Sequence, residues 1–229
     1  MRDIMPDTGL AGGGPDDAMP AATEPDGALP ARRPRKTPSG PRLGRDDWVL
    51  AAKKALVARG VDAVKIDRLA REIGVSRGSF YWHFKSRGEL LAALLTYWRD
   101  TNTTALRTAI EGNGGDGLAQ FKALIRTWLE EKDFSPSFDN AVRDWARHSK
   151  TASALLRRVD EERTVLFCDI FRNMGYDEAE CAIRARVLYF HQVGYYTLSL
   201  KERRADRRAT MPLYYKILTG KVAPGDLMD

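Results

Sequence analysis

The sequence has little of what several classes of protein need. Its 229 residues include two cysteines and three histidines, too few for a disulfide framework, and their spacing fits no metal site. No run approaches the roughly 20 apolar residues of a membrane-spanning helix, and the first 17 residues lack the layout of a signal peptide. We therefore predict a chain without a metal site or a membrane anchor, and a reducing cytoplasm is its simplest location.

Recognisable catalytic motifs are also lacking. No Ser/His/Asp or Cys/His pair stands in a known motif, no carboxylate pair stands out, and the glycine-rich stretch 111–117 is not followed by a Lys-Ser/Thr helix. We therefore expect that the chain is not an enzyme and that it uses no cofactor.

Positive charge is present but unevenly distributed. The formal net charge is +6 at pH 7. Residues 1–30 have a net charge of −5, residues 31–45 of +6 and residues 46–99 of +4, while the remainder is close to neutral. This asymmetry indicates a polyanionic partner for residues 31–99, although a solvated basic face would look the same.

Composition and periodicity divide the chain into three parts. Residues 1–44 are rich in Pro, Gly and Ala and hold almost no large apolar residues, so we expect a disordered tail with a basic arm. From residue 45 onward the apolar residues recur at helical spacing, and no convincing strand occurs. We predict an all-α chain with a three-helix domain over 45–99 and a larger helical domain over 100–229.

Turn and capping residues predict the helices. Asp46 or Asp47 is expected to cap a first helix that ends at Gly60, and one helix is expected to run from Arg87 to Ile110. The other predicted helices span 66–73, 77–83, 118–132, 138–148, 152–173, 177–200 and 207–219. Arg143 and Asp144 are expected to form a surface ion pair.

Residues 69–76 have the pattern of a helix-turn-helix. Ala70 is small, so a second helix can cross close above it, while Gly74 permits the sharp reversal and Val75 fills the gap between the helices. This packing projects the start of the second helix, so that its first turn can enter a major groove. The side chains it presents can contact phosphates and base edges: Ser76, Arg77, Gly78, Ser79, Tyr81, Trp82 and His83.

The stretch GVDAVKIDRLAREIGVSRGSFYWHFKSRGELL (60–91) resembles the DNA-binding domain of the TetR/AcrR family of bacterial transcriptional regulators. The resemblance covers about residues 45–99, and the run 74–84 carries most of its specificity. It implies a dimeric regulator, expected to be a repressor, that binds a palindromic double-stranded DNA operator and releases it when a small molecule enters the second domain. A nonspecific nucleoid-type DNA-binding protein is the alternative.

The resemblance also implies roles for individual residues. Arg77, Gly78 and Ser79 correspond to positions that approach base edges, and Tyr81 and His83 to positions that contact phosphates. Arg87 stands where Lys is commonest in the family, and Lys65 where a Thr or Ser is usual. The complete expected DNA-binding set is Arg42, Arg45, Lys65, Ser76, Arg77, Gly78, Ser79, Tyr81, Trp82, His83, Lys85 and Arg87.

For the second domain the resemblance is architectural only. It implies a homodimer through the last two long helices, about 177–201 and 207–219, and a ligand pocket among helices between residues 100 and 200. A core position would explain most of the aromatic residues there equally well. The candidate ligand-binding residues are Trp128, Trp145, Phe167, Phe171, Tyr189, His191 and Tyr195.

Overall fold

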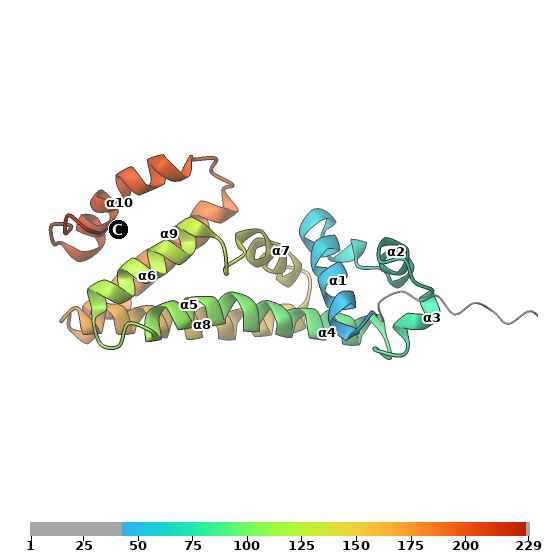
Figure 1. Cartoon of the computed structure of the whole chain (residues 1–229). Helices are drawn as coiled ribbons and strands as arrows, with labels where there is room; N and C mark the ends of the chain where they lie inside the picture. The colour runs from blue at the N-terminus through green and yellow to red at the C-terminus, as the bar shows by residue number, and fades with distance from the viewer. Residues whose placement is uncertain (1–42, 228–229) are drawn as a thin grey trace, which may run out of the picture. The chain divides into compact units, whose positions relative to one another are not determined.

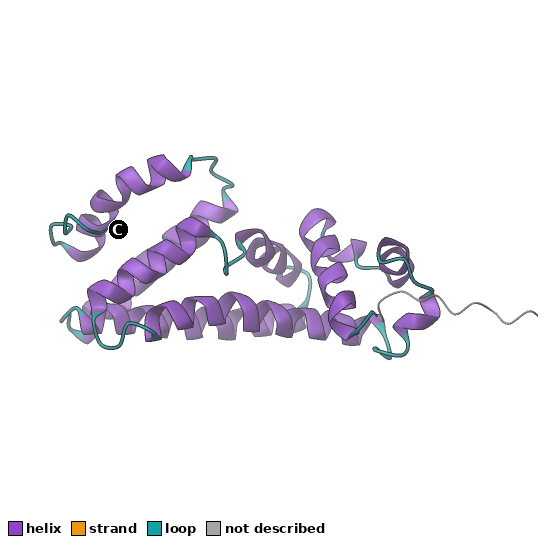
Figure 2. Cartoon of the chain, viewed as in Figure 1, coloured by secondary structure: helices purple, strands orange, loops and turns teal. Residues whose placement is uncertain are grey.

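The computed structural model describes residues 43–227, and this part of the chain consists of helices and loops without a strand (Figures 1 and 2). The predicted all-α fold is therefore confirmed. In chain order the elements are α1 (Arg45–Arg59), the 3₁₀ turn η1 (Val61–Ala63), α2 (Ile66–Glu72), α3 (Arg77–Phe80), α4 (Arg87–Trp98), the π-helical turn η2 (Arg99–Thr103), α5 (Thr104–Glu111), α6 (Gly117–Glu130), α7 (Pro136–Ala146), α8 (Lys150–Asn173), α9 (Glu178–Thr197) and α10 (Arg204–Thr219).

Short polar side chains begin most of the long helices. Asp116, Ser135, Ser149 and Asp177 each accept a hydrogen bond from the backbone N–H three residues further on, which satisfies one of the free donors of a helix N-terminus. Helix α1 begins differently from our prediction. Its N-cap is Gly44, and Asp47 accepts a hydrogen bond from the Gly44 backbone N–H at 2.7 Å.

The predicted helix from Arg87 to Ile110 is interrupted. Helices α4 and α5 follow one line in Figure 1, but the π-helical turn η2 separates them. The wider turn places the polar residues Asn102 and Thr103 in the interior, where they are 1% and 4% exposed. Such π-bulges are frequently found at functional sites.

Two hydrophobic clusters hold the described helices together. The first contains the apolar faces of α1, α2 and α4 and extends to Phe138, Val142 and Trp145 of α7 and to the first half of α8. The second joins α5, α6 and the second half of α8 to α9 and α10. The first cluster thus crosses the predicted boundary at residues 99 and 100, and that boundary remains a prediction.

Helices α6 and α8 approach each other closely at Gly117. A Cβ atom added at this glycine would lie 2.6 Å from the Ile170 carbonyl oxygen and 2.7 Å from the Met174 backbone nitrogen. Since backbone atoms cannot turn aside as a flexible side chain can, Gly117→Ala is expected to lower the free energy of unfolding by about 1–3 kcal/mol. Urea unfolding measures the change. Gly115→Ala is the matched control, since no atom lies within 4 Å of its added Cβ, and equal stability of the two variants would contradict the argument.

Candidate nucleic-acid interface and ligand cavity

The turn between α2 and α3 has the geometry that its residues predict. Gly74 adopts a φ of +73°, a conformation that side chains disfavour. The backbone N–H of Val75 donates to the Ala70 carbonyl at 2.9 Å, so the chain reverses tightly over a small buried residue. Below α3, the Phe80 ring meets the Trp48 ring edge-on at 5.1 Å and stacks on Phe84 at 5.5 Å. The turn is therefore fixed on a packed aromatic base.

Helix α3 is shorter than predicted. It ends at Phe80, and Tyr81, Trp82 and His83 continue in a tighter turn whose N–H groups donate to carbonyls three residues earlier. This turn directs the aromatic side chains outward, because Tyr81 is 51% and Trp82 is 87% exposed. Tyr81 and Trp82 therefore form a pair of neighbouring exposed aromatic side chains at the end of α3.

Arg77 lies at the start of α3 on this exposed surface. Its guanidinium is 3.5 Å from the Asp67 carboxylate and 3.5 Å from the Tyr81 hydroxyl. The hydrogen bond to Tyr81 and the charge of Asp67 raise the pKa of Arg77. Because the side chains of Arg77 and Asp67 are 60% and 64% exposed, these contacts are weak. Ser76 and Gly78 are exposed beside it, and Ser79 is half-buried.

The other predicted cations occupy different environments. Lys65 and Lys85 are exposed. Arg45 lies over the Phe84 ring at 4.5 Å and 3.9 Å from Glu89, and Arg42 lies outside the described residues.

Arg87 donates hydrogen bonds to the carbonyls of Val64 at 2.6 Å and Val61 at 2.7 Å. It therefore holds the turn η1 against α4, and only one guanidinium nitrogen has no contact of this kind. Its expected phosphate contact remains a prediction.

Three of the predicted ligand-binding residues lie together in one cavity. Trp128 of α6 and His191 and Tyr195 of α9 line it with residues of α10, among them Met211 and Tyr214. The cavity volume is about 30 Å³, room for one or two water molecules. The imidazole of His191 lies 4.7 Å from the Tyr214 ring, and burial together with the charge of Arg207 lowers the pKa of this histidine.

Gln192 is a further cavity residue, which the sequence did not predict. Gln192 is 7% exposed, lines the same cavity, and its side-chain nitrogen has no hydrogen-bond partner. An unpaired buried donor is costly and favours a ligand with a hydrogen-bond acceptor. Only the fold identifies this residue, since a glutamine in a helix gives no sequence signal.

The remaining candidates lie elsewhere in the described part of the chain. Phe167 is fully buried between Trp128 and Tyr189, whose rings it meets edge-on at 5.5 Å. Phe171 is also fully buried, and Trp145 belongs to the first hydrophobic cluster. Tyr189 is 4% exposed, and its hydroxyl donates to Asp160 at 2.6 Å. The structure therefore places Trp145, Phe167, Phe171 and Tyr189 outside the cavity.

A buried network of charged and polar groups connects α4 and η2 with α7, α8 and α9. Arg163 of α8 and Asp139 of α7 are 1% and 5% exposed and lie 2.9 Å apart. Asp139 also accepts hydrogen bonds from Trp98 at 3.0 Å and from Asn102 at 3.4 Å. The network thus ties the helix that leaves the helix-turn-helix to the helices that form the second core.

Arg143 also belongs to this network, and the predicted surface ion pair between Arg143 and Asp144 is wrong. It contacts Asp139 at 3.2 Å and Asp160 at 2.7 Å rather than Asp144, whose partner is Arg147 at 4.0 Å. The helical spacing of four residues turns Arg143 and Asp139 to the same face.

The described residues 43–227 contain neither a cluster of metal ligands nor a membrane-spanning helix. No group of three His, Cys, Asp or Glu side chains is arranged to hold a metal ion. No helix in this range is both long and apolar enough to cross a bilayer.

Comparison with protein families matches residues 49–94 to the model of bacterial regulatory proteins of the tetR family. Among curated proteins, the uncharacterized HTH-type transcriptional regulator TtgW of Pseudomonas putida is 41% identical over 61 residues, which are 27% of this chain and 46% of that protein. The HTH-type transcriptional regulator TtgR of the same species is 31% identical over 91 residues, 40% of this chain and 43% of that protein. The chain therefore spans less than half the length of these relatives.

Two solved structures align with more than three quarters of this chain. The ketosteroid transcriptional regulator KstR2 of Mycobacterium tuberculosis aligns with a TM-score of 0.58 at 17% identity, over 79% of this chain and 95% of that one. A transcriptional regulator from Rhodococcus sp. Rha1 aligns with a TM-score of 0.57 at 18% identity, over 77% and 92%. At these identities the likeness concerns the fold.

Proposed function

We propose that the chain is a transcriptional regulator of the TetR family, whose model matches residues 49–94, and that it binds a palindromic DNA operator as a dimer. The observation that carries this proposal is the exposed surface of α3 and its following turn. A guanidinium, small and hydroxyl-bearing residues and two exposed aromatic rings project from one packed support. A DNA-binding regulator in the cytoplasm, without catalytic activity, accounts for this surface and for the basic residues around it.

We assign two kinds of contact to this surface. Arg77, with its planar donor fork, and the adjacent Gly78 and Ser79 at the start of α3 would approach base edges in the major groove. Tyr81 and His83, with the exposed Lys85, would contact phosphates and fix the orientation of the helix. Trp82 would pack its exposed ring against the sugar-phosphate backbone.

A dimer would use the outer faces of α9 and α10. Ile183, Val187 and Phe190 recur at helical spacing on α9 and are 57%, 49% and 63% exposed. Leu213 and Ile217 of α10 are 63% and 76% exposed. Such a row of exposed apolar side chains is typical of a protein interface, and a second copy with its own α9 and α10 would complete a four-helix bundle. The two recognition surfaces, each formed by α3 and the turn 81–83 of one subunit, would then contact half-sites about 34–36 Å apart.

An effector would enter beside Trp128, His191 and Gln192. Since the cavity is far smaller than the roughly 300 Å³ of a typical ligand site, a ligand would have to displace α10. A displacement that favours a different spacing of the recognition surfaces would weaken operator binding, as in a repressor. A coupling of about 1–3 kcal/mol corresponds to a loss of about 5- to 150-fold.

In vitro selection from random duplex DNA at near-physiological salt tests the proposed function. We expect enrichment of an inverted repeat with half-sites about one helical turn apart. Salt-sensitive binding without enrichment would support the nonspecific nucleoid-type alternative. Absence of binding would contradict both.

Substitutions at the recognition surface test the assigned contacts on a selected site. Arg77→Ala is expected to weaken binding about ten- to hundredfold and to relax the preference at particular base pairs. Tyr81→Phe is expected to weaken all sequences more evenly, since it removes a phosphate contact. Fluorescence anisotropy on the selected site and on single-base variants measures both effects. Arg158→Ala is the matched control because Arg158 is exposed on α8; unchanged binding by both surface variants would contradict the assignments.

A further inference from the structure

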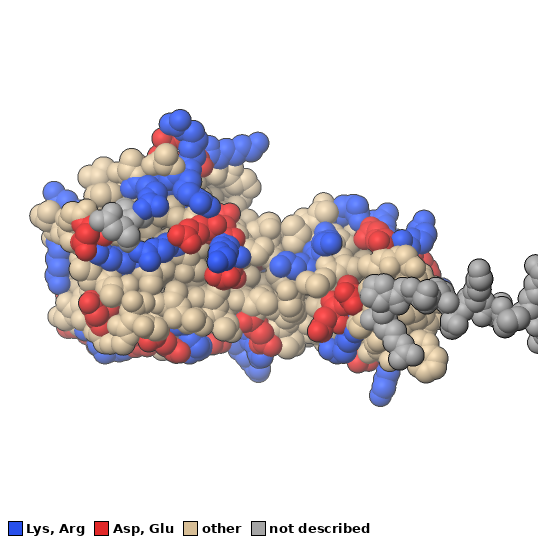
Figure 3. Space-filling model, viewed as in Figure 1, with Lys and Arg blue, Asp and Glu red and all other residues tan. Residues whose placement is uncertain are grey.

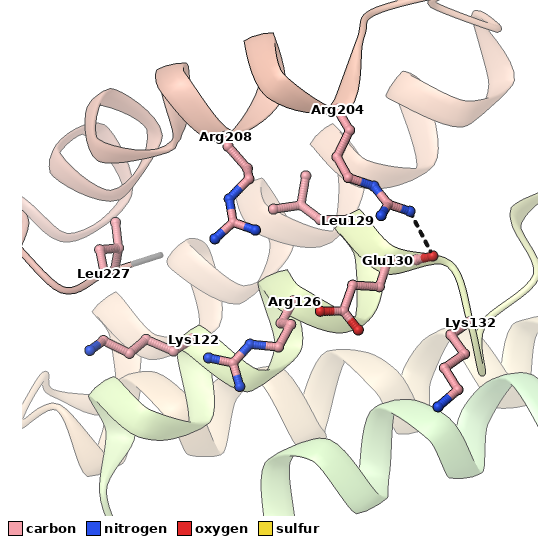
Figure 4. Close-up of a pocket in the computed structure, with 8 residues that line it drawn as sticks. All are labelled: Lys122, Arg126, Leu129, Glu130, Lys132, Arg204, Arg208 and Leu227. Carbon is pink, nitrogen blue, oxygen red and sulfur yellow. Dashed lines mark hydrogen bonds between the residues drawn. The ribbon is translucent and has the colours of Figure 1, made fainter. Parts of the chain in front are cut away.

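The two cysteines of the chain, Cys168 and Cys181, lie in its interior. Charged side chains are spread over the face shown in Figure 3, and basic residues of α6 and α10 line a pocket in which Arg204 donates to the Glu130 carbonyl at 3.0 Å (Figure 4). The cysteines instead belong to the second hydrophobic cluster, and they are 8% and 0% exposed. A reagent in solution therefore reaches Cys168 before Cys181.

The turn between α8 and α9 brings the two cysteines together. Cys168 lies near the end of α8 and Cys181 in the first turn of α9, and Gly175 reverses the chain between them with a φ of +89°. Arg172 of α8 forms an ion pair with Glu178 of α9 at 2.9 Å, which joins the facing ends of the two helices. The two thiols share a hydrogen bond across this contact. The chain has no other cysteine, so these two can pair within one chain only with each other.

The two sulfur atoms differ in their surroundings. The Arg172 guanidinium lies 3.9 Å from the Cys168 Sγ, whereas the Cys181 thiol donates to the backbone carbonyl of Tyr176 at 3.4 Å. Burial raises the pKa of both thiols, Glu178 also raises it, and Arg172 acts in the opposite direction. The hydrogen bond between the thiols lowers the pKa of Cys168 and raises that of Cys181. Cys168 therefore loses its proton more readily, and it is also the sulfur that solvent reaches.

We propose that Cys168 and Cys181 are a peroxide-sensitive pair that is converted to a disulfide between α8 and α9, with Arg172 stabilising the reacting thiolate. The Cys168 thiolate attacks one oxygen of hydrogen peroxide and the O–O bond breaks. The leaving hydroxide takes up a proton to give water, and Cys168 becomes a sulfenic acid. The Cys181 sulfur then gives up its proton and displaces the hydroxyl group from the Cys168 sulfur, which forms the S–S bond and a second water. Two electrons thus pass from the two thiols to the peroxide.

The structure favours a small and uncharged oxidant. Because Cys168 is 8% exposed, a bulky oxidant such as glutathione disulfide cannot place its sulfur beside it unless the helices separate. Hydrogen peroxide is close in size to a water molecule and carries no charge, so burial does not exclude it. The thiolate is the nucleophile, and burial raises the pKa of Cys168. Oxidation is therefore expected to be slower than at an exposed cysteine.

Peptide mapping of the full chain after peroxide treatment tests the proposal. The reduced protein is treated with hydrogen peroxide, quenched with catalase, alkylated in urea and digested with trypsin. Cleavage at Arg163, Arg172 and Arg184 places the cysteines in the separate peptides 164–172 and 173–184. We expect these peptides to be joined by a disulfide that dithiothreitol breaks, in a protein that runs as a single chain on non-reducing electrophoresis. Two alkylated cysteines after the treatment, or a linkage only between chains, would overturn the proposal.

Single variants assign the order of the two steps. In Cys181→Ser, whose hydroxyl can still donate to the Tyr176 carbonyl, we expect peroxide to leave Cys168 as a sulfenic acid that dimedone traps. In Cys168→Ser we expect Cys181 to remain a thiol, because it is 0% exposed. Dimedone labelling of Cys181 but not of Cys168 would contradict the assignment. Unchanged thermal unfolding is the control for both variants, and the mapping of the wild type does not depend on them.

Arg172→Gln tests the role of the neighbouring cation. Loss of the positive charge 3.9 Å from the Cys168 Sγ is expected to slow the oxidation severalfold, measured as the loss of free thiol with time. Arg158→Gln is the matched control, since it removes an exposed charge elsewhere on α8, and we expect it to react at the wild-type rate. Equal rates in the two variants would contradict the role of Arg172. These tests need neither DNA nor an effector, so their result is independent of the proposed function.

Discussion

Replacing Asp139 with Asn is expected to lower the free energy of unfolding by about 3–5 kcal/mol, the usual cost of breaking a buried ion pair by removing one partner. Arg163 would retain its charge at 1% exposure and lose the carboxylate 2.9 Å away. Its second terminal nitrogen already has no hydrogen-bond partner, so the remaining contacts cannot compensate. Trp98 and Asn102 would meet an amide in place of a charged acceptor.

Chemical unfolding measured by circular dichroism checks this expectation. Asp144→Asn is the matched control, because the Asp144 side chain is 75% exposed and its partner Arg147 is 4.0 Å away; we expect a change within about 0.5 kcal/mol. If Asp139→Asn is as stable as the control, the buried pair does not hold the helices together.

The same carboxylate predicts a pH dependence. Burial alone would raise the pKa of Asp139, but Arg163 and Arg143 outweigh burial and hold this pKa below its ordinary value. A lowered folded-state pKa stabilises the protein above the unfolded value of about 3.9, and the stabilisation is lost as the pH falls through the folded-state value. The difference in stability between wild type and Asp139→Asn should therefore shrink below about pH 4.

Replacing Phe190 with Asp is expected to convert the proposed dimer to monomers and to weaken operator binding more than a hundredfold. Phe190 is 63% exposed in the single chain, so the monomer tolerates the change. In a two-fold dimer each substitution occurs twice, and each carboxylate buried against apolar side chains costs several kcal/mol. Each subunit of the proposed dimer would bind one half-site, so loss of the dimer would remove half of the DNA contacts.

Analytical ultracentrifugation, followed by titration with the selected DNA, measures both consequences. Thr151→Asp is the control, because Thr151 is exposed in the first turn of α8, apart from the apolar face, and an acid is favourable at a helix N-terminus. A Phe190→Asp protein that remains dimeric would contradict the assignment of this face.

Local features of the chain could be predicted from its residues, because they depend on short-range rules. Ala70, Gly74 and Val75 define the reversal between α2 and α3 through size and backbone freedom. The caps at Asp177 and the stop at Gly220 follow from the free donors and acceptors of helix ends. The side chains that α3 and its turn expose could also be predicted from the residues. Helix α3 has only four residues, so few arrangements of its buried and exposed side chains are possible.

Features that depend on how distant helices meet could not be predicted. Arg87 resembles a phosphate ligand in sequence, but its donors reach the carbonyls of Val61 and Val64 more than 20 residues away. Phe167 and His191 look equally suited to a ligand, yet packing buries one in the core and places the other at a cavity.

By itself the sequence predicted the helical class, the helix-turn-helix and the resemblance to the tetR family, because these depend on spacing along one or two neighbouring helices. Only the tertiary structure decided that Arg163 is buried against Asp139, that Gln192 lacks a partner and that basic residues of α6 and α10 share one pocket. The charges of α6 and α10 are separated by more than 70 residues along the chain. Their proximity depends on the crossing of packed helices, and residue spacing does not encode that crossing.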